Sequence, residues 1–228
     1  MHLIQRGHNR HACFWQDTDR LVYLCLLHEL TVKTRCAVHA YVLMTNHVHV
    51  LLTPRDEDSC AMLMRNLGQR YVQYVNKRYA RSGTLWEGRY RSCLVDSAEY
   101  VLACHRYIEL NPVRAGMAES PATYRWSSHG GNTGMTKNKL LTAHCEYVAL
   151  AQDDQRRETA YRALFDRGDD PAFLKAIRGS TNGGLPLVGG RLAAQLAAQG
   201  HRLEPGTPGP APKQDGLTLD LLSGELGL

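Results

Sequence analysis

The sequence lacks the features that would place it in a membrane or in a disulfide-rich secreted class. Its seven cysteines are odd in number and scattered, and no two of them form a Cys-x-x-Cys pair. This pattern excludes a disulfide framework and a structural zinc finger, and it is typical of reduced thiols in the cytoplasm. No apolar run approaches the roughly 20 residues that a membrane-spanning helix needs, and the N-terminus has no signal-peptide core. We therefore expect a cytoplasmic protein with no membrane partner.

Acidic residues are scarce in one part of the chain. The 228 residues include 27 Lys and Arg against 22 Asp and Glu, a net charge of +5. The first 130 residues carry this whole excess, because the remainder has 11 residues of each sign. Within 65–91, seven basic residues stand against a single acid, Glu87. Such a stretch attracts phosphate, although a solvated helix face has the same pattern.

Hydrophobic periodicity predicts an α+β core in the first 128 residues. The predicted order is strand, helix, strand, strand, helix, strand, helix. This order suits an antiparallel sheet with helices on one face. The predicted strands are 2–5, 36–44, 47–53 and 90–95, and the predicted helices are 17–33, 59–79 and 97–110.

The rest of the chain divides by composition. Residues 129–142 are expected to be a flexible linker, and helical patterns return in 143–199. Residues 200–228 are rich in Pro and Gly and are expected to be a disordered tail. We therefore predict a domain over 1–128, a linker, a helical C-terminal appendage and a tail.

Two histidines stand one residue apart in the apolar run LMTNHVHVLLTP. Because strand side chains alternate, His47 and His49 share one face, with their backbones about 7 Å apart. Polar side chains seldom enter such a run unless something satisfies them, and two imidazoles on one face can bind a single metal ion. The pair alone leaves an alternative open, namely one hydrogen-bonded core histidine and one histidine near the surface.

A polar stripe is predicted on the helix over 97–110. At 100° per residue, Tyr100, Cys104, Tyr107 and Asn111 fall together at the border of the packed face. Tyr107 and Asn111 are one turn apart, about 6 Å at their backbones, so a phenol can attack a substrate while an amide oxygen supplies a ligand. Boundary tyrosines with hydrated hydroxyls are the alternative.

A tyrosine nucleophile needs activation, because the unperturbed pKa of its phenol is about 10. A divalent cation beside a phosphate polarises the phosphorus–oxygen bonds and lowers the effective pKa of an adjacent phenol. The histidines, the amide and the tyrosine therefore make sense together as a phosphodiester-cleaving site. With an amide and phosphate oxygens completing the shell, Mg²⁺ or Mn²⁺ fits better than zinc.

Three motifs, which follow one another along the chain, resemble those of the HUH single-tyrosine transposases of insertion sequences, and most of all those of the REP-associated tyrosine transposases. They are far more specific together than any one of them is alone. The resemblance covers residues 1–128 and implies the ferredoxin-like antiparallel sheet of the HUH fold. The three motifs are NHVHVLLTP, GTLWEGRYRSCLVD and RYIELNPVRAG.

The resemblance also implies roles for single residues. His47 and His49 would be the metal ligands, Tyr107 the nucleophile, and Asn111 matches the position of the third ligand. The family's tyrosine attacks a phosphate in single-stranded DNA, which leaves a 5′-phosphotyrosine bond and a free 3′-hydroxyl. Its substrates are imperfect hairpins with a short flanking guide sequence. We therefore expect palindromic DNA as the partner, and a monomer or a homodimer as the assembly.

The basic stretch then becomes a candidate surface for the hairpin backbone. Its aromatic residues are candidates for stacking on unpaired bases, although about half of them are expected in the core. The candidate DNA-binding residues are Arg65, Arg70, Lys77, Arg78, Arg81, Trp86, Arg89 and Arg91.

Three other functions are compatible with parts of the pattern. A domesticated relative would apply the same chemistry to dispersed chromosomal palindromes, and sequence alone does not separate it from a mobile-element transposase. A non-catalytic hairpin-binding protein needs neither Tyr107 nor the histidines. A metal hydrolase that attacks through bound water is disfavoured, because the acids nearest to the histidines, 56–58, lie beyond Pro54.

Overall fold

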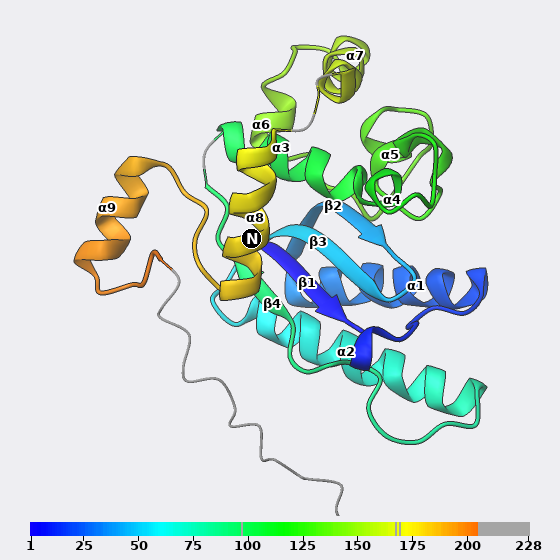
Figure 1. Cartoon of the computed structure of the whole chain (residues 1–228). Helices are drawn as coiled ribbons and strands as arrows, with labels where there is room; N and C mark the ends of the chain where they lie inside the picture. The colour runs from blue at the N-terminus through cyan, green and yellow to red at the C-terminus, as the bar shows by residue number, and fades with distance from the viewer. Residues whose placement is uncertain (97, 167, 169, 205–228) are drawn as a thin grey trace, which may run out of the picture.

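A four-stranded antiparallel sheet forms the centre of the molecule (Figure 1). The computed structural model describes residues 1–96, 98–166, 168 and 170–204. The strand order is β2-β3-β1-β4, so the first strand lies between the third and the fourth. The predicted antiparallel α+β class is confirmed. The strands are β1 His2–Arg6, β2 Cys36–Leu43, β3 His47–Pro54 and β4 Arg91–Cys93.

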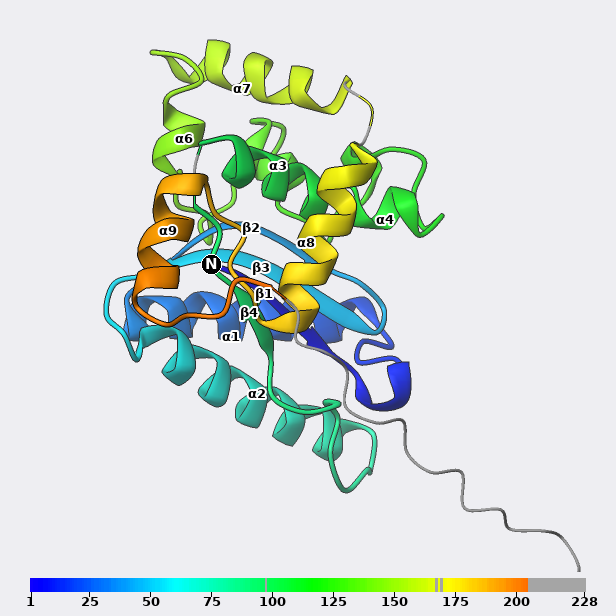
Figure 2. The same cartoon turned by 60° about the vertical axis from the view of Figure 1, so that its left-hand side comes forward.

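Helices cover both faces of this sheet (Figures 1 and 2). Helices α1 (Asp17–Thr34) and α2 (Ser59–Arg78) pack on one face, as predicted. Helices α3 (Ala98–Glu109) and α8 (Pro171–Gly183) pack on the other. The prediction of helices on one face therefore holds for α1 and α2 only. The ends of the predicted strands and helices in 1–128 are shifted by no more than two residues.

The two covered faces create two apolar cores. Successive strand residues point to opposite faces, so Val50 packs toward α1 and α2 while Leu51 packs toward α3 and α8. This explains why β3 reads as a nearly continuous apolar run. Its two histidines interrupt only the side that faces α3 and α8.

The remaining elements are short. They are η1 His8–Arg10, α4 Asn111–Arg114, η2 Pro121–Thr123, α5 His129–Asn132, α6 Cys145–Val148, α7 Asp154–Ala163, η3 Leu164–Asp166 and α9 Gly190–Ala198.

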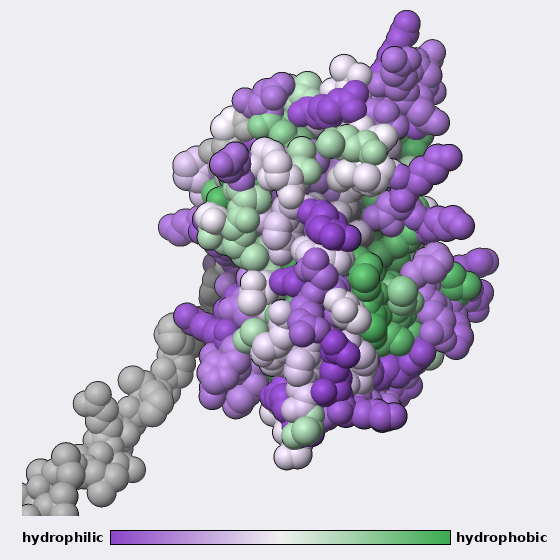
Figure 3. Space-filling view, turned by 90° about the vertical axis from the view of Figure 1, so that its right-hand side faces the viewer, coloured by the Kyte–Doolittle hydropathy of each residue, from purple (hydrophilic) through white to green (hydrophobic). Residues whose placement is uncertain are grey.

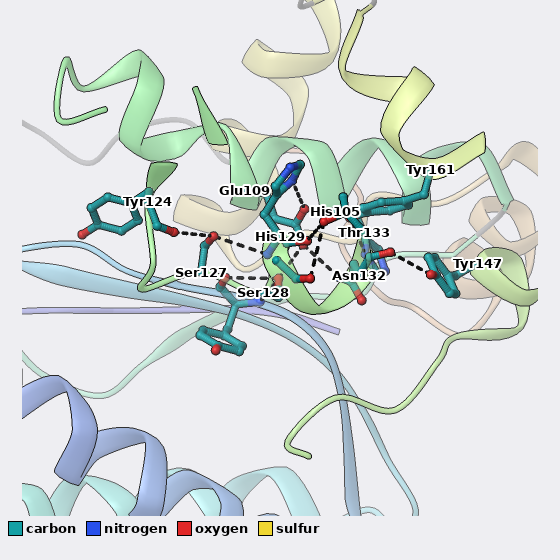
Figure 4. Close-up of polar contacts among 12 residues, drawn as sticks. His105, Glu109, Tyr124, Ser127, Ser128, His129, Asn132, Thr133, Tyr147 and Tyr161 are labelled. Atoms are coloured by element: carbon teal, nitrogen blue, oxygen red, sulfur yellow. Dashed lines mark hydrogen bonds and ion pairs between the residues drawn. The ribbon is translucent and has the colours of Figure 1, made fainter. Parts of the chain in front are cut away.

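The predicted linker, 129–142, is folded rather than extended. It contains α5, and it is attached to α3 through the buried carboxylate of Glu109, which is 0% exposed (Figure 4). Every donor to this carboxylate lies at or beyond residue 128, so the segment is an integral part of the domain. The donors are Ser128 Oγ at 2.5 Å, His129 Nδ1 at 3.0 Å, Asn132 Nδ2 at 2.8 Å and the Tyr161 hydroxyl at 2.9 Å.

The predicted C-terminal appendage is also part of the domain. Ile177 of α8 is fully buried in the second core. The following segment pairs with the chain after β4, where the Leu187 amide donates to the Leu94 carbonyl at 2.7 Å. Helix α8 itself contacts β4 and β1, so it lies over the face of the sheet that carries the histidines. The predicted tail beyond residue 204 lies outside the described residues.

Two of the exclusions drawn from composition can be compared with the structure. All seven cysteines are free thiols, and only Cys25 and Cys145 are exposed. Among the described helices, none combines the length and the apolar character that crossing a membrane would require.

Candidate active site

The pairing register of β1 with β3 creates a row of polar side chains beneath α3 and α8. Ile4 is opposite His49, and Arg6 is opposite His47. Because the pleat alternates, His2, Ile4 and Arg6 point to the same side as both histidines. The sheet therefore presents His47 and His49 together with a cation from the neighbouring strand.

A cavity of about 230 Å³ lies over this row. The structure brings together all four residues that the sequence predicts for the catalytic and metal-binding site, from β3, α3 and α4. It adds residues of β1 and α8 that were not predicted. The lining residues are Ile4, Arg6, His47, His49, Tyr107, Asn111, Arg178, Thr181 and Asn182.

Tyr107 is almost buried, with 8% of its surface exposed, and the centroid of its ring is 5.6 Å from that of His49. Burial raises the pKa of its phenol above the ordinary value, while a hydrogen bond from Arg178 and the charge of Arg114 oppose that rise. The Arg114 guanidinium also lies 4.8 Å from the centroid of the Tyr107 ring. Both arginines were missed from sequence, although Arg114 belongs to the NPVRAG motif.

Tyr100, on the same predicted stripe, does not reach this cavity. Its ring stacks on Phe173 at 6.3 Å, and it lines a separate cleft of about 620 Å³ between α3 and α8. Cys104 is buried in the second core. Of the stripe, only Tyr107 and Asn111 line the cavity with the histidines.

Asn111 keeps its place despite the proline that follows it. The residue begins α4, and its Nδ2 donates to the Tyr107 backbone carbonyl at 2.9 Å. This bond orients the amide and leaves Oδ1 as the acceptor that is available in the cavity. Pro112 therefore does not remove Asn111, the predicted third ligand, from the cavity.

Neighbouring contacts determine which nitrogen of His47 carries its proton. Asn46 donates through Nδ2 to the Arg10 carbonyl at 2.9 Å, so its Oδ1 faces His47 Nδ1 at 2.6 Å. An amide oxygen only accepts, and the ring must therefore donate from Nδ1. In the neutral ring, Nε2 then holds the free lone pair.

A longer chain of hydrogen bonds determines the tautomer of His49. The Thr181 hydroxyl donates to the Ile177 carbonyl at 2.7 Å, so its oxygen accepts from His2 Nδ1 at 2.9 Å. Burial lowers the pKa of His2 to about 3, and its ring is neutral. His2 Nε2 must then accept from His49 Nδ1, 2.9 Å away. The free lone pair of His49 is again on Nε2.

The donors of the cavity fit a divalent cation. Burial lowers the pKa of His47 to about 4 and that of His49 well below its usual value, so both rings are neutral at pH 7, which is the form that binds metals. Two Nε2 atoms and one amide oxygen provide three ligands. No trio of His, Cys, Asp or Glu side chains suited to a metal occurs within the described ranges.

The predicted DNA-binding residues fall into two groups. Arg89 and Arg91 line a cleft of about 520 Å³ that shares Ile4, Arg6 and Asn182 with the cavity. The α2 residues lie across the sheet from the cavity, where Arg70 pairs with Glu29 at 2.9 Å. Arg65, Lys77 and Arg78 are exposed on that helix.

Trp86 requires a correction. Its side chain is 6% exposed and packs in the core between the sheet and α2, so its ring is not available for stacking on a base. Tryptophan side chains are highly buried on average, so a tryptophan within a basic stretch can belong to the core. Arg81, by contrast, is exposed and lies near the end of β1.

Comparison with known proteins identifies a family and a fold. Residues 1–111 match the family described as "Transposase IS200 like". A solved structure described as "Structure of the REP associates tyrosine transposase bound to a REP hairpin" is similar, with 14% identity and a TM-score of 0.50. The match covers 63% of this chain and 84% of that chain, and it indicates a shared fold. No curated protein sequence matches the chain.

Proposed function

Residues 1–111 carry the domain of the IS200-like transposase family, and on that premise we propose that the protein cleaves and rejoins single-stranded hairpin DNA through Tyr107. The observation that supports this most strongly is the meeting of His47, His49, Tyr107 and Asn111 in one cavity. The similar solved structure holds a REP hairpin, which makes hairpin DNA the substrate to test first.

The lining of the cavity also weighs against the alternatives. None of the described residues that line it is Asp or Glu, so a water molecule there would lack a carboxylate base. A binding module would not need a phenol and two neutral imidazoles oriented toward a common space. The chemistry that these residues favour is attack by the phenol on a phosphate.

In the proposed reaction, the Tyr107 oxygen attacks the scissile phosphorus and loses its proton. The bond from phosphorus to the 3′-oxygen breaks, and that oxygen takes up a proton to become a free 3′-hydroxyl. A 5′-phosphotyrosine bond remains on the enzyme. Attack by another 3′-hydroxyl reverses these changes and rejoins the strands, with no net loss of a phosphodiester and no need for ATP.

The side chains around Tyr107 would stabilise the charges of this reaction. Arg178 hydrogen-bonds the phenol and would stabilise the phenolate as it forms. Arg6, on the other wall of the cavity, would neutralise the phosphate oxygens. His47, His49 and Asn111 would hold Mg²⁺ or Mn²⁺, which when bound polarises the phosphate.

The test of this proposal is to look for a covalent adduct between the protein and DNA. We expect single-stranded oligonucleotides copied from the DNA that flanks the gene to form a protein–DNA species that survives denaturing electrophoresis. Tyr107→Phe should abolish the adduct and leave DNA binding nearly unchanged, because only the hydroxyl is lost. Tyr100→Phe is the matched control and should retain the adduct. An adduct in Tyr107→Phe that disappears in Tyr100→Phe would show that the nucleophile is misassigned.

The biological setting belongs to the same proposal. A cytoplasmic enzyme that acts on palindromes would serve either a mobile element or a domesticated function. Palindromes that flank the gene itself would favour the first, and palindromes dispersed through the chromosome the second.

A further inference from the structure

A second cleft, which the proposed reaction does not use, lies where β1 ends. It has a volume of about 520 Å³ and is formed by η1 with the segment after it and by the loop that follows α2. We call it the aromatic cleft. Its lining residues are His8, His11, Ala12, Trp15, Tyr79, Arg81, Thr84 and Leu85.

Trp15 is the unusual residue of the aromatic cleft. It is 43% exposed, whereas Trp86 and Trp126 are 6% and 7% exposed. Its ring centroid is 4.9 Å from that of Tyr79, and the Arg81 guanidinium is 5.4 Å from the Trp15 centroid. An indole and a phenol beside a guanidinium are the groups on which nucleobases stack.

The walls of the cleft are held from beneath by Asp19. Its buried carboxylate accepts from the Trp15 backbone amide at 2.9 Å and from the Tyr79 hydroxyl at 2.7 Å. A backbone hydrogen bond also joins the two segments that form the cleft, because the His8 amide donates to the Leu85 carbonyl at 2.9 Å. The aromatic walls are therefore positioned before any ligand arrives, which lowers the entropy cost of binding.

The route from the catalytic cavity to the aromatic cleft is basic. Arg6 lines the cavity, and the adjoining cleft contains Arg10, Arg89 and Arg91 against a single acid, Glu87. Within the part of the chain that the structure describes, Arg6 and Arg10 have no ion-pair partner. None of the lining residues of the aromatic cleft is acidic. β1 ends at Arg6 and η1 begins at His8, so only Gly7 lies in the chain between Arg6, which lines the catalytic cavity, and His8, which lines the aromatic cleft. A short stretch of extended DNA therefore spans the distance between the two.

The surface around the cleft is suited to a polar partner. The loop after α2 lies at the right of Figure 1, and Figure 3 shows that end of the molecule face-on. The face is largely hydrophilic, with a hydrophobic patch toward one side. The lining of the cleft itself contains two histidines and Arg81 and no acid, which favours a nucleic acid strand over an apolar protein segment as the occupant.

We propose that the aromatic cleft binds an unpaired nucleobase of the single strand whose phosphates follow the arginines from the catalytic cavity. The proposal rests on the proposed function for the identity of the ligand as DNA. It adds a base-recognition site, away from the cleavage chemistry, that would position the flank of the substrate. Base stacking would supply the affinity there, and the arginines would supply charge neutralisation.

Trp15 also provides the measurement, because it is the exposed tryptophan of the three. We would titrate the full chain, with chelator present to prevent cleavage, with the octanucleotide dT8 and with an eight-residue oligomer of abasic sites. Both probes carry the same phosphates, and only dT8 carries bases. We expect dT8 to quench the tryptophan fluorescence and the abasic oligomer not to.

Two variants separate stacking from charge. Trp15→Leu should weaken dT8 binding about tenfold, measured by anisotropy of a labelled probe, and should leave binding of the abasic oligomer unchanged. Val148→Ala, an exposed apolar residue on α6, is the control and should alter neither. Equal quenching by both probes, or unchanged dT8 affinity in Trp15→Leu, would overturn the proposal.

The two proposals fail in different ways. If the Tyr107 adduct forms with flanking oligonucleotides but dT8 gives no base-dependent quenching, the transposase reaction stands and the base site is wrong. If quenching depends on the bases but no adduct forms, the base site stands and the reaction is wrong.

Discussion

Thr181 shows how a single hydroxyl on a helix distant in the sequence can determine the tautomer of His49, a proposed metal ligand. It ends the chain of hydrogen bonds that begins at His49 Nδ1 and passes through His2. Thr181→Val keeps the shape and removes the acceptor. Since outer-shell partners typically contribute 10–100-fold to metal affinity, we expect Mn²⁺ binding, measured by calorimetry, to weaken by about that factor.

Thr181→Ser is the matched control for this change, because it restores the hydroxyl with a smaller side chain. It should recover most of the affinity. Nitrogen chemical shifts of the metal-free protein give a second readout, in which His49 should be protonated on Nδ1 in the wild type. A wild-type ring protonated on Nε2 would contradict the assignment independently of any activity.

The histidine pair itself is the next residue-scale prediction. His47→Ala and His49→Ala should each remove strand cleavage, and excess chelator should do the same to the wild type. Added Mg²⁺ or Mn²⁺ should restore the chelated enzyme but not the variants. Cleavage at full rate in excess chelator would show that no metal takes part.

At this scale the sequence could identify the four candidate residues that line the cavity but not the residues that orient them. His47, His49, Tyr107 and Asn111 stand at strand and helix spacings that can be read directly. His2 and Arg178 have no such spacing relative to the site. They reach it through the register of β1 on β3 and the packing of α8, which are tertiary contacts.

Among the elements, α2 and the segment that leads into β4 divide the basic stretch between two surfaces. Arg89 and Arg91 lie beside the cavity, whereas Arg65 and Lys77 are exposed on the helix across the sheet. We expect Arg89→Gln with Arg91→Gln to reduce the slope of log affinity against log salt by roughly two units, as for two lost phosphate contacts.

The matched control is Arg65→Gln with Lys77→Gln, which removes the same charge from α2. Salt titrations of hairpin affinity should leave its slope close to that of the wild type. If the Arg65 and Lys77 double variant lowered the slope and the Arg89 and Arg91 double variant did not, the DNA would lie on the face of the sheet that α1 and α2 cover.

The helix α8 explains why the architecture was only partly predictable. Its periodicity indicated a helix within 143–199, and the helix is present. Periodicity shows that one side is apolar, but it does not show which surface that side covers. The predicted appendage over 143–199 includes Ile177, which the structure buries in the second core.

For the whole molecule, buried neutral histidines make stability depend on pH. Burial lowers the pKa of His39 and of His105 to about 4, from about 6.5 in the unfolded chain. Between these values the unfolded protein binds more protons, so the free energy of unfolding falls as pH falls. Their contribution is complete above pH 6.5 and decreases by up to about 1.4 kcal/mol per pH unit for each histidine.

Urea unfolding at pH 7 and at pH 5 checks this. The midpoint should be clearly lower at pH 5 in the metal-free protein. Equal midpoints would mean that these rings bind protons as readily in the folded protein as in the unfolded chain.

The buried carboxyl group of Glu109 sets a lower limit on the length of a fragment that would keep the candidate site folded. A fragment that stopped at residue 128 would contain the three motifs but only one of the four donors to that carboxylate. A buried polar group left without its hydrogen-bond partners costs about 1–3 kcal/mol, and Glu109 is two residues from Tyr107. Such a fragment would also lack Thr181 and Arg178. The smallest fragment of this chain that would keep the candidate site intact therefore extends through α8, well beyond the motifs that carry the family resemblance.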